Sequence, residues 1–363
     1  MKKTTLKLCF LAMLMILQMP FAMSQQNNSQ CWNQFRGTDR NGACEYATLN
    51  QFSEHAPKLL WKKKLGDGFS EITVSGNRIY TMLSEKKDSV SGSEFIAAFD
   101  AKTGNEVWRT KVDSIFFDTF GDGPRSTPAI GDDKIFSLSS YGKLTASSKK
   151  NGKTVWQIDF VKEFGSTTPR WGFSSSPVLM DNSLIVEVGG TDSRAFMAFD
   201  KDSGKILWTK GDGNASYNSP VISEIDGQKN IIFANGSKLY ALSTQGDTLW
   251  NYNAAINGPT AMPLVIDSNK IFVSDVSSPG FYVVEVKDNK ATELIHGSSM
   301  KTDYSSAIYY NGYIYGFHVA ALQCISAETG EKKWAKRGFG KGSLIRVGDQ
   351  LLVFHVYHRG TVI

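Results

Sequence analysis

After its first two dozen residues, the sequence lacks any long apolar segment. The one sustained apolar run, at 8–21, follows the basic start Met1-Lys2-Lys3. No later stretch approaches the roughly 18 apolar residues that a membrane-spanning helix needs. Ala22 and Ser24 then supply the small residues of a cleavage site. We therefore predict a signal peptide over 1–24 and a periplasmic or secreted chain that does not span a membrane. A signal anchor is the alternative.

The sequence is also poor in cysteine and in excess charge. Loss of Lys2, Lys3 and Lys7 with the signal would leave 37 basic and 35 acidic residues, a net charge of +2. This balance excludes a strong general attraction to nucleic acid or to an anionic membrane. In an oxidising compartment the pair Cys31 and Cys44 is a disulfide candidate.

The motifs of common enzyme classes are missing as well. The sequence contains no CxxCH, HExxH or Gly-x-Ser-x-Gly pattern. Gly-Asp-Gly recurs at 66–68, 121–123 and 211–213, but a single acid per turn suits a flexible turn better than a calcium site. We predict no metal site and assign no catalytic residue.

What the sequence does contain is a repeat. "AFDAKTGNEVW" at 98–108 returns as "AFDKDSGKILW" at 198–208 and as "CISAETGEKKW" at 324–334. Successive positions of the final Trp, one of them replaced by Leu294, are 48, 52, 42, 44 and 40 residues apart. Between two of these positions, at 156 and 208, lie four short β-rich runs separated by turn residues. A period of 40–50 residues with four strands predicts an all-β protein, a β-propeller of four-stranded blades.

The repeated Trp has a structural interpretation. In the copy at 98–108, Asp100 to Gly104 forms a tight turn, and the strand that returns from it carries the Trp. A side chain of that size, placed once per blade, is predicted to dock on the neighbouring blade and to seal the seam between them. The predicted docking residues are Trp61, Trp108, Trp156, Trp208, Trp250 and Trp334.

The pattern Ala-x-Asp-x-x-x-Gly-x-x-x-Trp resembles the tryptophan-docking motif of quinoprotein alcohol dehydrogenase-like propellers. That superfamily includes pyrroloquinoline quinone (PQQ) dehydrogenases and the periplasmic propeller lipoprotein of the outer-membrane β-barrel assembly machinery. With "GPRSTP" at 123–128 and "WGFSSSP" at 171–177, the chain is similar to exported PQQ-like β-propeller repeat proteins. The resemblance implies relatives with eight blades.

Counting repeats predicts seven blades in this chain. Trp61 lies in an outer-strand position with no blade before it, and three strands follow Trp334. We predict that 59–64 forms the outermost strand of the last blade and closes the ring. The predicted organisation is a signal peptide at 1–24, an N-terminal extension at 25–58 with the disulfide candidate, and a propeller at 59–363.

Two functions remain open. The leading prediction is a monomeric, non-enzymatic binding or scaffolding propeller whose partner is an envelope protein or a small ligand. The alternative is a PQQ-dependent dehydrogenase or a PQQ-binding protein. The resemblance implies that such an enzyme would need a Glu, an Asn and an Asp around Ca²⁺, a catalytic Asp and often a vicinal disulfide. This sequence has no adjacent cysteines and no recognisable calcium set. No cofactor is therefore predicted.

The candidate binding site comes from the segments just ahead of the inner strands, which meet at the channel mouth of a propeller. They bring aromatic and cationic residues to one face, where such residues favour partner binding. A structural plug of the channel is the other interpretation. The candidate residues are Arg125, Arg170, Trp171, Tyr217, Thr260, Tyr304 and Lys341.

Overall fold

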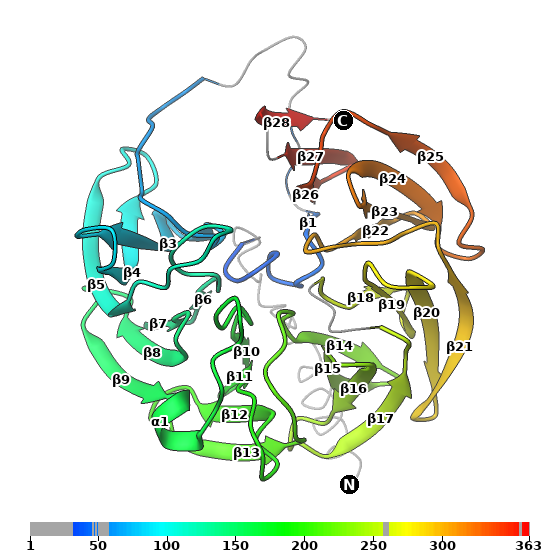
Figure 1. The fold of residues 1–363 in the computed structure, drawn as a ribbon, viewed down its shortest axis with the longest axis horizontal. Coiled ribbons are helices and arrows are strands. Elements are labelled where there is room, and N and C mark those ends of the chain that lie inside the picture. The colour runs from blue at the N-terminus through cyan, green and yellow to red at the C-terminus, as the bar shows by residue number, and fades with distance from the viewer. Residues whose placement is uncertain are drawn as a thin grey trace, which may run out of the picture.

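The computed structural model describes residues 32–45, 47, 49, 58–256, 261–355 and 358–362. It is a ring of seven sheets around a central axis, each with four strands (Figure 1). The chain passes from blade to blade in sequence order. The all-β class and the seven blades predicted from the repeat are therefore confirmed.

The strands are as follows. Blade 1 holds β2 (Thr73–Ser75), β3 (Arg78–Lys86), β4 (Gly92–Asp100) and β5 (Glu106–Ser114). Blade 2 holds β6 (Ala129–Ile130), β7 (Lys134–Leu138), β8 (Lys143–Ser148) and β9 (Thr154–Asp159). Blade 3 holds β10 (Val178–Met180), β11 (Ser183–Glu187), β12 (Phe196–Asp200) and β13 (Ile206–Lys210). Blade 4 holds β14 (Val221–Ile225), β15 (Gln228–Asn235), β16 (Lys238–Leu242) and β17 (Thr248–Asn253). Blade 5 holds β18 (Leu264–Ile266), β19 (Lys270–Ser274), β20 (Phe281–Lys287) and β21 (Lys290–Gly297). Blade 6 holds β22 (Ile308–Tyr310), β23 (Tyr313–His318), β24 (Ala321–Ser326) and β25 (Lys332–Lys336). Blade 7 holds β1 (Ala43–Cys44), β26 (Gly342–Val347), β27 (Gln350–His355) and β28 (His358–Val362).

A short helix, α1 (Phe160–Phe164), stands between blades 2 and 3. The Asp159 side chain caps its first turn by accepting a hydrogen bond from the Lys162 backbone N–H at 3.1 Å. Gly165 ends the helix in the left-handed conformation, with φ of 68°. The helix buries Phe160 against Phe173 and Phe199 in the core between these blades.

The Ala of the repeated motif has a packing role. It lies on the third strand of its blade, directly opposite the Trp on the fourth, as in the pairs Ala98–Trp108 and Ala198–Trp208. The Ala side chains are fully buried. A residue this small leaves room for the indole to lie across the sheet.

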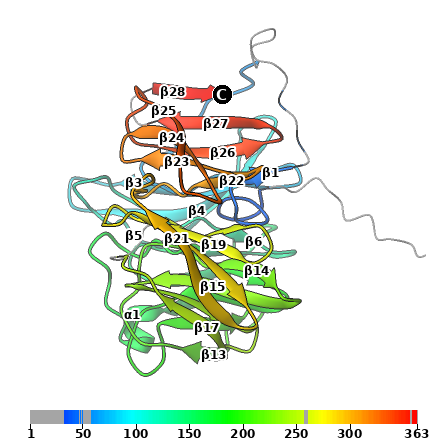
Figure 2. The same ribbon diagram turned by 90° about the vertical axis from the view of Figure 1, so that its right-hand side faces the viewer.

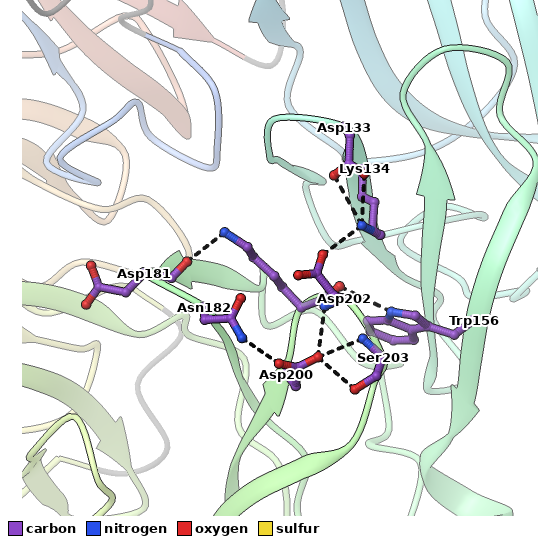
Figure 3. A network of polar contacts seen from close by, with 9 residues as sticks. Asp133, Lys134, Trp156, Asp181, Asn182, Asp200, Asp202 and Ser203 are labelled. Carbon is purple, nitrogen blue, oxygen red and sulfur yellow. Dashed lines mark hydrogen bonds and ion pairs between the residues drawn. The ribbon is translucent and has the colours of Figure 1, made fainter.

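Four Trp side chains dock on the tight turn of a blade, and their contacts follow one pattern. The indole N–H donates to a backbone carbonyl in the tight turn of the next blade, and the ring covers the Gly of that turn. The Trp156 N–H donates to the Lys201 carbonyl at 3.2 Å. Figure 3 shows Trp156 beside the turn that Asp200 holds through Ser203. Any Cβ at Gly204 would lie 3.0 Å from the Trp156 ring. The same bonds are Trp61 to Ala101 at 3.0 Å, Trp108 to Lys149 at 3.3 Å and Trp208 to Thr244 at 3.1 Å.

The last two predicted docking residues depart from this pattern. Trp250 is buried, but its N–H donates to Asn230 within its own blade at 2.8 Å. The next blade has Lys290 at the Gly position of the motif, and its turn is formed by Asp288 and Asn289. The prediction that Trp334 is buried in a seam is wrong: 37% of it is exposed. The blade that follows it has no Asp-x-x-x-Gly turn among its described residues.

Ring closure also differs from the prediction. Residues 58–66 form no strand, so 59–64 is not the outermost strand of blade 7. That position belongs to β28, and the N-terminal part of the chain supplies the innermost strand instead (Figure 2). β1 pairs with β26 in parallel, through Arg346 N–H to Gly42 O at 2.8 Å and Gly348 N–H to Cys44 O at 3.1 Å. Trp61 still docks on the tight turn of blade 1, without a strand to carry it.

Residues 32–45, assigned from sequence to an extension outside the propeller, lie across the central channel (Figure 1). We call this segment the plug. Its carbonyls accept from the inner strands, Trp32 O from Val74 N–H at 2.7 Å and Asn33 O from Ile130 N–H at 2.9 Å. Arg36 donates to Ala307 O at 2.7 Å, and Arg40 donates to Ser176 O at 3.1 Å. The plug thereby ties blades 1, 2, 3, 6 and 7 together.

Candidate functional site

Four of the predicted site residues meet on one face of the ring. They lie in the connections that run from the outer strand of one blade to the inner strand of the next, between blades 1 and 4. Arg125 Nε donates to Trp171 O at 2.8 Å, and the Trp171 N–H lies 3.4 Å from the Tyr217 hydroxyl. The Trp171 and Tyr217 rings are 5.0 Å apart, and the Arg170 guanidinium lies 5.8 Å from the Trp171 ring. Three successive connections are therefore linked.

The Arg125 guanidinium links the segments of this cluster by hydrogen bonds and ring contacts. Besides Trp171 O, it donates to Gly121 O at 2.8 Å and to Gly123 O. Its guanidinium lies 4.7 Å from the Phe116 ring and 5.3 Å from the Phe69 ring. Burial lowers the pKa of Arg125, although nearby carboxylates oppose that effect. Because three of its five N–H donors bond to loop carbonyls, Arg125 positions this surface.

The exposed part of the cluster is aromatic. Phe120 is 76% exposed and meets the edge of the Trp171 ring at 6.3 Å between centroids. Phe69 and Tyr141 are also exposed. Sequence reasoning missed these three residues. Phe69 and Phe120 lie ahead of inner strands, which was a usable signal, whereas Tyr141 lies in the turn between β7 and β8. We call the exposed surface of Phe69, Phe120, Tyr141, Arg170 and Trp171 the Trp171 face.

The remaining predicted residues lie apart from this cluster. Tyr304 and Lys341 contact each other, with the ammonium 5.2 Å from the ring, and Lys341 is paired with Asp303. They come from the connections on either side of blade 6, whereas the Trp171 cluster comes from blades 1 to 4. Contacts among the described residues thus form two groups instead of one. Thr260 lies outside the described residues.

Two buried carboxyl groups lie at the sheet ends under the Trp171 face. Burial raises the pKa of Glu187 to about 8, although Ser216 donates to it at 2.7 Å and Asn235 also donates. Burial likewise raises the pKa of Glu94 to about 7, and the Ser140 N–H donates to it at 3.0 Å. Both carboxyl groups bond to residues of the neighbouring blade or connection, so they help to fix the floor of this face.

Two observations bear on the alternative of a calcium–quinone group. No cluster of three or more His, Cys, Asp or Glu side chains that could hold a metal occurs within the described part of the chain. The channel axis is occupied by Arg36 and Arg40 of the plug, both buried. Burial lowers the pKa of Arg36 to about 10 and that of Arg40 to about 9, with Glu71 as the nearby opposing carboxylate.

The cysteines and membrane spans can be described only in part. Cys44 is disulfide-bonded and Cys324 is free and buried. Cys31, the predicted partner of Cys44, lies outside the described residues, so the pairing stays a prediction. None of the helices in the described ranges has the length and apolar character needed to cross a membrane.

The fold and the site define a seven-bladed propeller with tryptophan-docked seams, a plugged channel and an aromatic face. A family model described as "Outer membrane protein assembly factor BamB" matches residues 92–336, more than half of the chain. The chain belongs to this family. The resemblance drawn from the repeat is thereby confirmed.

Individual relatives are more distant. The outer membrane protein assembly factor BamB of Shewanella oneidensis is 23% identical over 242 residues, covering 60% of this chain and 56% of the relative. Quinohemoprotein alcohol dehydrogenase ADH IIB of Pseudomonas putida is 27% identical over 150 residues, covering 38% of this chain and 20% of the relative. The chain thus spans about half of the first relative and a fifth of the second. The crystal structure of BamB from Moraxella catarrhalis shares the fold, with a TM-score of 0.57, 17% identity and coverage of 82% and 81%.

Proposed function

We propose that this chain is an exported, non-enzymatic scaffold of the bacterial cell envelope that binds a protein partner through the Trp171 face and takes part in outer-membrane protein assembly. Membership of the family supports the general role. The observation that carries the binding site is the exposed aromatic surface beside Arg170. Aromatic and Arg side chains dominate interface hot spots because they combine a large contact area with directional polar groups.

Preorganisation of this surface supports the same conclusion. The Trp171 backbone is held on both sides, by Arg125 at its carbonyl and by Tyr217 at its N–H. Side chains already ordered in the free protein lose little conformational entropy on binding. The channel itself is a weaker candidate for a partner protein, because the plug crosses it. A partner therefore meets the rim of the ring and not its axis.

The experiment compares two double variants. Phe120→Ala with Trp171→Ala removes most of the exposed aromatic area, while Val107→Ala with Val155→Ala removes exposed apolar side chains from outer strands. We expect the first to abolish co-purification of an envelope assembly protein and the second to leave it intact. Both variants should keep the thermal unfolding temperature of the parent within a few degrees. Equal partner recovery with both variants would refute this assignment.

We further infer that the chain works without a quinone. The inference is supported by the plug, which lies across the channel and buries Arg36 and Arg40 there. Purified protein mixed with PQQ and Ca²⁺ should show no change in the quinone absorption spectrum and no oxidation of an alcohol by an electron acceptor. A saturable spectral change would favour the alternative function.

A further inference from the structure

The plug does not fill the channel evenly. Its hydrogen bonds run to blades 1, 2, 3, 6 and 7, and a cleft lies between it and the inner strands of blades 4, 5 and 6. One part of the cleft, about 340 Å³, is lined by 39–41, 221–224 and 263–265. A second part, about 330 Å³, shares Asn41, Leu264 and Val265 with the first and extends to 309–311. Each volume is at the lower end of the range that small ligands occupy.

The wall of this cleft includes the open edge of a β-sheet. β14 is the first strand of the sheet β14-β15-β16-β17, so one of its edges has no neighbour among the strands of the described residues. β14 joins β15 through a two-residue turn in which Asp226 and Gly227 both have positive φ, 51° and 73°. Such a turn makes Ile225 and Gln228 a hydrogen-bonded pair, and bonded pairs alternate along the ladder. The N–H and C=O groups of Ile222 and Glu224 therefore point toward the channel.

The same alternation already operates elsewhere in this ring. In β2, Ser75 lies next to the turn and pairs with Arg78. By the same alternation, the backbone groups of the preceding residue, Val74, should point toward the channel. The Val74 N–H does point inward, and it donates to the plug carbonyl of Trp32 at 2.7 Å. On blade 7 the added segment forms a full strand, β1, on the inner edge of β26. Inner strands of this propeller thus bind extended chain along the channel.

The exposed charges around the cleft are acidic. Asp39 and Glu224 are both exposed, and neither has an ion-pair partner among the described residues. Arg346, by contrast, is 4% exposed and is paired with Glu45. The ligand that complements this cleft therefore combines extended backbone with a positive side chain.

We propose that the cleft binds a short extended peptide segment with a Lys or Arg side chain, which pairs with the inward edge of β14 and places its cation beside Glu224 and Asp39. The inward groups of Ile222 and Glu224 are two residues apart, about 7 Å along a strand. They match two carbonyls at positions i and i+2 of a peptide, so three to four residues span the site. This site is separate from the Trp171 face and does not depend on the proposed function.

The experiment uses the full chain and two synthetic peptides, acetyl-Thr-Val-Lys-Val-Thr-amide and the same peptide with Glu in place of Lys. Titration should show saturable binding of the Lys peptide and at least fivefold weaker binding of the Glu peptide. Amide hydrogen exchange measured by NMR should slow at Ile222 and Glu224 when the Lys peptide binds. The Ser223 amide, which faces β15, should change little.

Two variants at one position separate backbone pairing from charge. Glu224→Gln keeps the N–H and should reduce the preference for Lys over Glu, with Asp39 left as the remaining carboxylate. Glu224→Pro removes the inward N–H, is compatible with an edge strand, and should weaken both peptides by about five- to tenfold. Absence of saturable binding, equal binding of the two peptides to the parent protein, or binding without protection of Ile222 and Glu224 would each overturn the proposal.

Discussion

Docking of the indole rings predicts that two tryptophans from the same motif differ sharply in their contribution to stability. Trp108 is 8% exposed and covers Gly152, while Trp334 is 37% exposed and meets no docking turn among the described residues of the next blade. Truncation of a buried Trp leaves a cavity and removes most of its contacts, which lowers the free energy of unfolding by about 3–5 kcal/mol. For the exposed residue we expect a loss of about 1 kcal/mol.

Urea denaturation followed by far-UV circular dichroism would measure both variants, Trp108→Ala and Trp334→Ala. Their midpoints are comparable only if the two m-values agree with that of the parent. A difference of about 2 kcal/mol or more between the variants supports docking. Our interpretation is that contact with the next blade supplies the stability, whatever the repeat motif. Equal losses of unfolding free energy in the two variants would refute it.

The seam can also be tested from its other side. Gly152 has φ of 75°, and a Cβ there would lie 2.5 Å from the Trp108 ring. Gly152→Ala should therefore destabilise by about 1–3 kcal/mol through overpacking, besides the strain of the backbone itself. In a Trp108→Ala background most of the overpacking disappears. The stability losses of the two single variants, Gly152→Ala and Trp108→Ala, should therefore sum to more than the loss in the double variant. Strict additivity would show that the ring and the turn do not act together.

Two smaller predictions concern buried groups. Since the pKa of Glu187 is raised in the folded state to about 8, folded protein binds more protons than unfolded protein between the ordinary carboxyl pKa and 8. The free energy of unfolding should then fall as pH rises from about 4.5 to 8. In unfolding measured across this pH range, Glu187→Gln should make the fall shallower, and an unchanged pH dependence would contradict the assignment. If Cys31 is the partner of Cys44, thiol titration of the unfolded, unreduced mature protein should detect one thiol, Cys324, whereas three thiols would exclude the bridge.

The repeat was enough to predict the fold because each copy encodes a complete local unit. The Asp and Gly of the turn, the Ala on the third strand and the Trp on the fourth are all within about ten residues. Ring closure could not be predicted in the same way. The two-residue strand β1 has no periodicity to detect, and its pairing with β26 joins segments some 300 residues apart.

The candidate site was predictable only by position. Its residues were expected in the connections ahead of the inner strands, and Trp171 and Tyr217 do meet there. Sequence alone does not show that Arg125 donates hydrogen bonds to loop carbonyls. It also does not show that Phe120 is the most exposed ring of the Trp171 face. Nor does it show that Arg36 and Arg40 bury their charges in the channel. These features depend on contacts between segments that the repeat does not relate.

Site-specific photocrosslinking in the native envelope tests the binding face most directly. A photoreactive amino acid at position 120, on the Trp171 face, would be compared with one at position 155, on the outer strand β9. The proposed function predicts that position 120 crosslinks to an outer-membrane assembly protein, identified by mass spectrometry, and that position 155 does not. Crosslinks of equal yield from both positions, or none from position 120, would contradict it.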